Sequence, residues 1–329
     1  MKLRLKDVLI TIIGTAVLLV AAIYSESFVP TGFSAEKFIP KVLERRDSMY
    51  GITVFGDRVV WLVGNNGKIV KSTDAGKTWE NQESGTTHHL HGVSAWDEKR
   101  AVGVGNNGIV VVTTDGGASW NAPDVPKSQV ANKLIKVKTL PNGQAWAVGS
   151  MGMVIATGDW GTTWYIRIPE EDLAWNDIAF ADSRVGVMVG EFGHIKRTFD
   201  GGDSWQDVPS PVQSSLFGVA ARDPDNWVAV GLDGFVLMST DGGQSWKTTD
   251  QTVTQEHLLA VLWEGDRYIA VGNMGVVAIG NPAADKWYSH QLSKTELLWH
   301  TDMAKLKTGV FIVGGTQGIL QDGKWSYLL

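Results

Sequence analysis

Five aspartates recur at a nearly constant spacing and are the first residues whose type and pattern suggest chemistry. Successive members are 41 or 44 residues apart, and a tryptophan follows each by five positions. The aspartates are Asp74, Asp115, Asp159, Asp200 and Asp241, and the tryptophans are Trp79, Trp120, Trp164, Trp205 and Trp246. Carboxylates could bind calcium or act as acids and bases. We expect a structural role instead, because the repeats separate the five carboxylates and because an aspartate accepts hydrogen bonds from its own turn.

Three histidines, His88, His89 and His91, lie close together in the sequence. Imidazole nitrogen binds zinc and related metals, so these residues are weak candidates for a metal site. We favour the alternative that they make local hydrogen bonds in a solvated loop, since the other histidines fall in separate repeats. The chain has no cysteine, which excludes disulfides and thiolate metal sites. The sequence also lacks phosphate-loop and hydrolase-elbow motifs, and we expect no cofactor.

The elements that position these residues form a seven-fold repeat. A Val-Gly pair recurs every 41 to 44 residues, at Gly64, Gly105, Gly149, Gly190, Gly231, Gly272 and Gly314. Within one unit, such as residues 90–122, four short apolar segments are separated by turn residues. Four strands in about 41 residues are typical of a propeller blade. We predict an all-β fold with one domain at 46–329, a seven-bladed propeller of four-stranded antiparallel blades. Its ring closes by blade packing or by an added strand at residues 38–43.

The composition agrees with a folded chain. Hydrophobic residues make up 43% and charged residues 19% of the sequence, which is enough apolar material for a sizeable core. The formal net charge of -6 argues against a protein that binds nucleic acid phosphates.

The N-terminal segment predicts export. Lys2, Arg4 and Lys6 precede an uncharged run at residues 8–24. This run is intermediate between a signal-peptide core and a membrane span, so residues 1–24 are a signal peptide or a signal anchor. Residues 25–45 are a linker. The positive-inside rule then places the propeller in the periplasm, or on the extracytoplasmic face, either secreted or anchored in the cytoplasmic membrane by this segment.

The aspartate turns resemble a known repeat. Segments 72–79, 113–120, 157–164, 198–205 and 239–246 look like Asp-boxes, the bacterial neuraminidase repeat. Seven such units behind an export signal resemble the photosystem II assembly and stability factor family, over residues 49–329. The resemblance implies a non-enzymatic scaffold that binds a membrane protein or membrane-protein complex. The chain has no lipobox cysteine or plastid transit peptide, so we expect a non-photosynthetic bacterial member, and similar propellers in such bacteria are sometimes encoded beside RND-type transporters.

Asp-box propellers also include sialidases, so the alternative function is a glycan-binding propeller or a sialidase-like glycoside hydrolase. That family uses an arginine triad, a tyrosine nucleophile and carboxylates. The predicted inner strands lie near 50–55, 91–96, 134–139, 175–180, 216–221, 259–264 and 298–303, and none of them contains arginine. We therefore predict no enzyme. A glycan-binding propeller stays open, because Trp96, Trp175, Trp263 and Trp299 lie on or near these strands and could stack on sugars.

Two surfaces are candidates for partner binding. Gly-x-x-Gly hairpins join the second and third strands, and their tips offer four apolar residues on one face, namely Met151, Phe192, Leu232 and Met274. Such an arc would suit a protein partner, unless each tip packs against a neighbouring connection. The opposite face offers four arginines for an acidic partner, unless they merely solvate strand ends: Arg58, Arg100, Arg184 and Arg267.

Overall fold

The computed structural model describes residues 42–44, 46–249 and 252–328. The predicted signal segment and most of the linker therefore lie outside the described residues, as does most of the optional strand at 38–43. Val42–Leu329 form one compact unit. The described residues hold no α-helix and only five single turns of 3₁₀ helix, which are η1 (Asn65–Gly67), η2 (Pro141–Gly143), η3 (Glu191–Gly193), η4 (Leu232–Gly234) and η5 (Asn273–Gly275). None of the described helices has the length and apolar character needed to cross a membrane.

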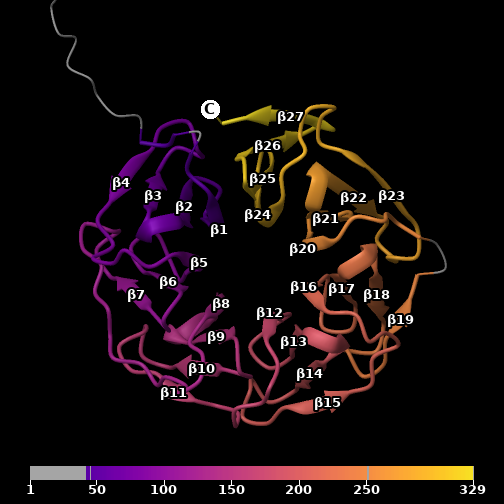
Figure 1. Ribbon diagram of the computed structural model, residues 1–329, viewed down its shortest axis with the longest axis horizontal. Helices are drawn as coiled ribbons and strands as arrows, with labels where there is room; N and C mark the ends of the chain where they lie inside the picture. Colours follow the sequence, from indigo (N-terminus) through magenta and orange to yellow (C-terminus); the bar gives the residue numbers. More distant parts are fainter. Residues whose placement is uncertain (1–41, 45, 250–251, 329) are drawn as a thin grey trace, which may run out of the picture. The chain divides into compact units, whose positions relative to one another are not determined.

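Seven antiparallel sheets form a ring around a central axis, which confirms the seven-bladed propeller (Figure 1). In each blade the strands follow one another from the axis outward in chain order. Blades 1 to 3 contain β1 (Met49–Phe55), β2 (Val59–Gly64), β3 (Ile69–Ser72), β4 (Glu80–Gln82); β5 (Leu90–Ala95), β6 (Ala101–Gly105), β7 (Val110–Thr113); and β8 (Leu134–Thr139), β9 (Ala145–Gly149), β10 (Val154–Thr157), β11 (Tyr165–Ile166).

Blades 4 to 7 each have four strands. They are β12 (Trp175–Phe180), β13 (Gly186–Gly190), β14 (Ile195–Thr198), β15 (Gln206–Val208); β16 (Leu216–Ala221), β17 (Trp227–Gly231), β18 (Val236–Ser239), β19 (Lys247–Thr248); β20 (Leu258–Trp263), β21 (Tyr268–Gly272), β22 (Val276–Gly280), β23 (Trp287–Gln291); and β24 (His300–Leu306), β25 (Gly309–Gly314), β26 (Gly318–Gln321), β27 (Lys324–Tyr327).

Blade 2 departs from the prediction of four strands. Its fourth strand is reduced to one bridge, between Val112 and Asn121. In blade 1 the corresponding ladder continues from Lys71↔Glu80 to Ile69↔Gln82. Pro123 stands in blade 2 where blade 1 has Gln82. Proline has no N–H to donate, so the ladder ends there.

The core lies between neighbouring blades. All residues of the second and third strands of blade 1 are buried, and so are their counterparts in most other blades. Each hydrophobic cluster joins strands of two adjacent blades, so a blade buries its apolar faces only against its neighbours.

The ring closes by packing between blades 7 and 1. Blade 7 contains its own four strands, and residues 42 and 43 are not in a strand. Phe311 packs edge-on against Trp79 with ring centroids 5.9 Å apart. Gln317 Nε2 donates to the carbonyl of Asp47 at 3.1 Å, and Thr301 Oγ1 donates to the carbonyl of Tyr50 at 3.1 Å.

Candidate partner-binding site

The Asp-box carboxylates are saturated by their own turns. Asp74 Oδ1 accepts hydrogen bonds from the Thr78 N–H and the Ser72 hydroxyl, both at 2.8 Å, and Oδ2 accepts from the Thr78 hydroxyl at 2.7 Å. The other four turns repeat this pattern. These hydrogen bonds, with the Thr78 N–H first, lower the pKa of Asp74 to about 2. A carboxylate bound in this way has a structural role.

Three of the five Asp-box tryptophans anchor their turns by donating the indole N–H to a carbonyl of the same turn. Trp79, Trp164 and Trp246 do so at 3.0, 3.0 and 3.2 Å, to Gly76, Gly161 and Gly243 in that order. Blade 6 keeps this geometry with Asn281 as the acceptor in place of the Asp-box aspartate: Trp287 donates to the Ala284 carbonyl at 2.9 Å, and Asn281 Oδ1 accepts the Asp285 N–H. Trp120 instead donates to Gln82 at 3.1 Å.

The hairpin tips lie on the face that carries the connections between blades, which we call the tip face. At its first residue, each tip is tied to the start of its own blade, as in Leu232 N–H to the Ser215 carbonyl at 3.0 Å. At its second residue, three tips are tied to the next connection: Asn66 N–H to His89 Nδ1 at 2.9 Å, Asp233 N–H to His257 Nδ1 at 3.0 Å, and Phe192 N–H to Ser215 Oγ at 3.4 Å. The backbone of each tip is therefore fixed.

The histidines called weak metal candidates each have a local partner. His89 accepts the hydrogen bond from Asn66 already described. His91 Nε2 lies 2.8 Å from Asn106 Oδ1, and His88 Nε2 lies 3.3 Å from Asn107 Nδ2. Across residues 42–44, 46–249 and 252–328 no group of three potential metal-binding side chains occurs. The contacts match a role in bracing the tips.

The second tip residue adopts a left-handed backbone conformation in blades 1 to 6. Asparagine occupies it in blades 1 and 2 and aspartate in blade 5, and both tolerate this region. Blades 3, 4 and 6 instead place Met151 (φ 57°), Phe192 (φ 55°) and Met274 (φ 53°) there. Phe192 is 63% exposed and Met274 is 42% exposed, whereas Met151 and Leu232 are half-buried. Leu232 holds the first tip position, so it is not equivalent to the other three.

Further apolar side chains on the tip face lie in a connection that does not repeat. Leu297 and Leu298, just before blade 7, are 51% and 44% exposed. The Leu298 carbonyl accepts the Gly275 N–H at 2.8 Å, next to Met274. Trp299 follows and stacks on Tyr50 with centroids 5.7 Å apart. These five residues, Met274, Leu297, Leu298, Trp299 and Tyr50, form one apolar sector across blades 6, 7 and 1. Sequence reasoning did not assign Leu297, Leu298, Trp299 or Tyr50 to a partner surface, and it considered Trp299 only for stacking on sugars.

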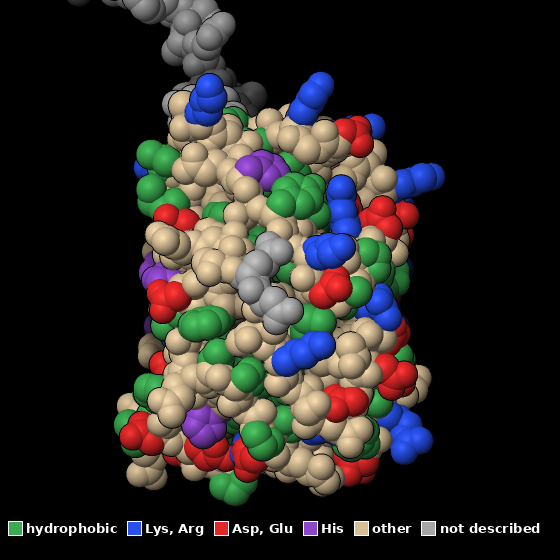
Figure 2. Space-filling view, turned by 90° about the vertical axis from the view of Figure 1, so that its right-hand side faces the viewer, with side chains coloured by type: hydrophobic (Ala, Val, Ile, Leu, Met, Phe, Trp, Pro, Cys, Tyr) green, Lys and Arg blue, Asp and Glu red, His purple; other side chains and the backbone are tan. Residues whose placement is uncertain are grey.

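The four arginines of the opposite face, the box face, have partners in the structure. Arg58 pairs with Glu98 at 2.7 Å, Arg100 with Asp97 at 2.6 Å and Arg267 with Glu264 at 2.5 Å. Arg100 also lies over the Trp160 ring, 3.4 Å from its centroid. Arg184 donates from Nε to the Phe199 carbonyl at 3.3 Å. Figure 2, a view of the rim, shows basic side chains crowded toward one flat face and interspersed with acidic ones. The charge of three arginines is thus compensated.

The axis is crossed by an ion pair. Lys136 Nζ in blade 3 lies 2.8 Å from Asp302 Oδ1 in blade 7. Burial acts to lower the pKa of Lys136, but the carboxylates of Asp302 and Asp177 outweigh it and raise that pKa. Burial also raises the pKa of Asp177. The arginine triad that sialidase chemistry requires has no counterpart among these residues.

The tryptophans behind the glycan alternative do not form one sugar-stacking platform at the axis. Trp175 is fully buried, and Trp96 donates to the Gln144 carbonyl at 2.7 Å and packs against Trp160. Trp299 stacks on Tyr50 at the tip face, and Trp263 packs on Tyr268 with centroids 4.8 Å apart.

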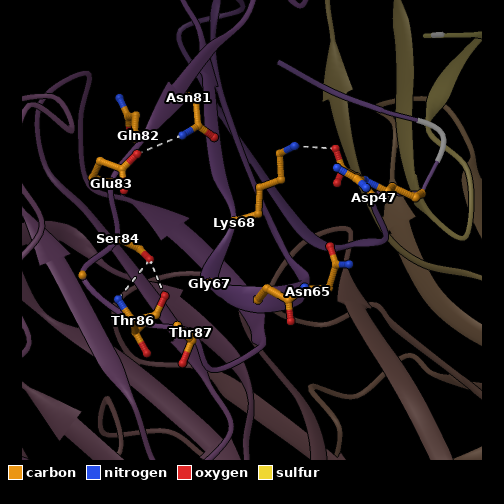
Figure 3. Close-up of a pocket in the computed structure, with 13 residues that line it drawn as sticks. Asp47, Asn65, Gly67, Lys68, Asn81, Gln82, Glu83, Ser84, Thr86 and Thr87 are labelled. Carbon is orange, nitrogen blue, oxygen red and sulfur yellow. Dashed lines mark hydrogen bonds and ion pairs between the residues drawn. The ribbon is translucent and has the colours of Figure 1, made fainter. Parts of the chain in front are cut away.

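A polar cavity of about 650 Å³ lies beside the blade 1 tip. Figure 3 shows Lys68 pointing toward Asp47, with which it forms an ion pair, and Asn81 pointing toward Glu83. Ser84 and Thr86 close the opposite wall through their own hydrogen bonds. A similar cavity of about 620 Å³ lies beside the blade 4 tip, next to Phe192 and His194. Such a cavity therefore accompanies the tips of blades 1 and 4.

Comparisons with known proteins agree with the repeat analysis. Residues 165–247 match the family model described as photosynthesis system II assembly factor YCF48, and residues 23–185 match a DUF6242 beta propeller domain. No curated protein matches the chain.

Solved structures give the same fold. YCF48 from Cyanidioschyzon merolae has a TM-score of 0.67 at 15% identity, over 83% of this chain and 94% of that chain. YCF48 bound to D1 peptide has a TM-score of 0.67 at 18% identity, over 82% and 91%. The WD40 beta propeller domain of Doa1 has a TM-score of 0.66 at 11% identity, over 83% and 92%. The resemblance predicted from the repeats is confirmed, since residues 165–247 match the model of the photosystem II assembly factor family and the ring has the fold of YCF48.

Proposed function

We propose that this protein is a non-enzymatic scaffold that docks a membrane protein on its tip face. The proposal is supported by the YCF48 family match and by a similar structure in which YCF48 holds a D1 peptide. The propeller supplies a rigid ring, and function then depends on the side chains displayed on it.

One observation carries the choice of face. Phe192 and Met274 are exposed although their backbones are left-handed. A non-glycine residue in this region costs on the order of 1 kcal/mol, and asparagine bears it better than a bulky side chain. Burial in the propeller does not offset that cost. An apolar anchor for a partner is the function that such an exposed, strained position serves.

The apolar sector extends this surface. Its five side chains come from blades 6, 7 and 1, which are neighbours in the ring, and the Trp299 ring stacks on Tyr50. Contiguous exposed apolar groups on a soluble surface mark sites of protein or membrane contact. Methionine and leucine adapt to a partner's shape, and aromatic residues supply much of the binding energy.

The cellular location and the class of membrane-protein partner are inferred from the sequence alone. We place the propeller in the periplasm or on the extracytoplasmic face, with residues 1–24 as a cleaved signal or a retained anchor. In a non-photosynthetic bacterium an RND-type transporter is a suitable partner.

Site-specific cross-linking tests the proposal. A photoreactive phenylalanine analogue at Phe192 preserves the ring and its exposure, and the same analogue at Tyr165, 62% exposed on the outer strand of blade 3, is the matched control. Irradiation of native membranes should join one membrane protein to position 192 and not to position 165. Equal products at both positions, or none at 192, would reject docking on the tip face.

A further inference from the structure

The box-face half of the central channel is a cavity that no role described above uses. Its volume is about 360 Å³, and all seven inner strands line it. The lining begins at the third residue of the inner strands, where Lys136, Asp177 and Asp302 lie, and continues toward the box face. Lys138 and Lys305, further along the same strands, are exposed. The cavity thus has a charged floor and a basic mouth.

Backbone N–H groups converge on this cavity because every inner strand has the same irregularity. The pairing of first and second strands shifts register after the first residue in all seven blades, as in a β-bulge. At the fourth residue of their strands, the N–H groups of Ile52 and Val219 point to the axis, where they donate to Asp302 Oδ2 at 3.1 Å and Asp177 Oδ2 at 3.0 Å. The equivalent positions in the other blades are Val93, Val137, Ile178, Val261 and Met303.

The two aspartates satisfy four of these seven donors. Asp302 also accepts the Met303 N–H at 3.0 Å, and Asp177 also accepts the Ile178 N–H at 2.8 Å. No side-chain acceptor is found for the N–H of Val93, Val137 or Val261 in the part of the chain that the structure describes. All three residues line the cavity. Buried N–H groups need an acceptor, and two of these three belong to the adjacent blades 2 and 3.

The charges around the cavity favour a negative acceptor. Three lysines, Lys136, Lys138 and Lys305, line the cavity together with two aspartates, and the first of these lysines is paired with Asp302. Asp177 also attracts Lys138, but three lysines against two aspartates leave one positive charge in excess in the lining, and neither Lys138 nor Lys305 forms an ion pair among the described residues. Backbone N–H groups and a lysine ammonium are the donors that bind oxyanions.

We propose that the box-face half of the channel binds a small free oxyanion, such as a carboxylate or sulfate, through the N–H groups of Val93 and Val137 and the ammonium of Lys138. Val261 and Lys305 face the ion from the other side of the ring. This site is independent of the tip face, so it stands or falls apart from the docking proposal.

Anion-dependent unfolding of the full chain, in the same mild detergent throughout, tests the site. Sodium sulfate and sodium acetate are titrated at constant ionic strength, with sodium chloride as the balancing salt. Because a ligand of the folded state raises the midpoint of thermal unfolding, the parent should show a saturable rise. Lys138→Met should weaken the apparent affinity roughly tenfold, as expected for loss of one charged hydrogen-bond partner.

The control is Lys77→Met, which removes the same charge from an exposed Asp-box turn on the same face. It should leave the apparent affinity unchanged, because the long-range effect of a surface charge is screened. A parent midpoint that shows no saturable rise with either anion at constant ionic strength, or equal losses in the two variants, would overturn the proposal.

Discussion

Lys136 in blade 3 and Asp302 in blade 7 form an ion pair across the propeller axis, with Nζ and Oδ1 2.8 Å apart. Asp302 also receives the N–H of Ile52 in blade 1, so one carboxylate ties three blades together. Both side chains are largely buried, with exposed fractions of 15% each. The pair therefore stabilises the ring from its centre.

Lys136→Met should destabilise the protein by about 3 kcal/mol, because it leaves buried carboxylates without their cation. The free energy of unfolding in urea measures this loss. Arg58→Met removes an arginine from an exposed pair with Glu98 and should cost no more than about 1 kcal/mol. Adding Asp302→Asn to Lys136→Met should restore part of the loss; fully additive effects would show that the two side chains are not coupled.

Glycines beside the tips allow a test of the close packing between tips and connections. A Cβ on Gly234 (φ 67°) would collide with the Thr254 carbonyl oxygen, whereas one on Gly85 (φ 72°) would meet nothing within 4 Å. Both substitutions to alanine incur a backbone cost of on the order of 1 kcal/mol. Gly234→Ala should cost about 2 kcal/mol more than Gly85→Ala in thermal unfolding. Equal costs would mean that the tip is not packed against its connection.

The Asp-boxes predict acid sensitivity. Hydrogen bonds lower the pKa of Asp74 and Asp115 to about 2, from a usual value of 3.8. A lowered pKa in the folded state contributes stability above pH 3.8, and this contribution is lost as the pH falls toward 2. Urea midpoints measured between pH 6 and pH 2 should fall in that interval. Asp74→Asn should flatten the fall and lower the midpoint at pH 6; an unchanged pH dependence would show that the turn does not hold its carboxylate.

Replacing the exposed tip residues by asparagine should not harm folding. Asn66 and Asn107 occupy the same left-handed position in blades 1 and 2. Phe192→Asn and Met274→Asn should therefore leave the thermal midpoint unchanged or raise it. The gain in the free energy of unfolding should be up to about 1 kcal/mol for each substitution. A clear loss of stability would show that these side chains pack within the propeller and do not serve a partner.

The repeat made most of the fold predictable. Spacing, Val-Gly pairs and Asp-boxes identified seven blades because each blade must bury its faces on similar neighbours. The short fourth strand of blade 2 was missed, although Pro123 is visible in the sequence. Only the pairing register of the third and fourth strands shows that the ladder needs an N–H at position 123. The ion pairs of the arginines were also not foreseen. Glu98 lies 40 residues from Arg58 and reaches it only through the fold, whereas Asp97 and Glu264 stand three residues before Arg100 and Arg267 and were visible in the sequence.

The site was less predictable than the scaffold. Hairpin spacing identified the tips, and the sequence correctly put Phe192 and Met274 at them. It did not reveal their left-handed backbone or the half-burial of Met151 and Leu232, since these depend on the neighbouring connection. Leu297 was outside the predicted strands, whereas Leu298, Trp299 and Tyr50 fell on predicted inner strands, and their contact arises only when blades 6, 7 and 1 meet.

Partner recovery from native membranes tests the docking account most directly. The full-length parent is compared with the double variant Phe192→Asn and Met274→Asn and with the matched rim variant Tyr165→Ser and Tyr288→Ser, which removes two side chains that are 62% and 59% exposed on outer strands. After cross-linking, the account predicts one membrane protein recovered by the parent and the rim variant and lost by the folded tip variant. Recovery of that protein by the tip variant at the parent's level would contradict it.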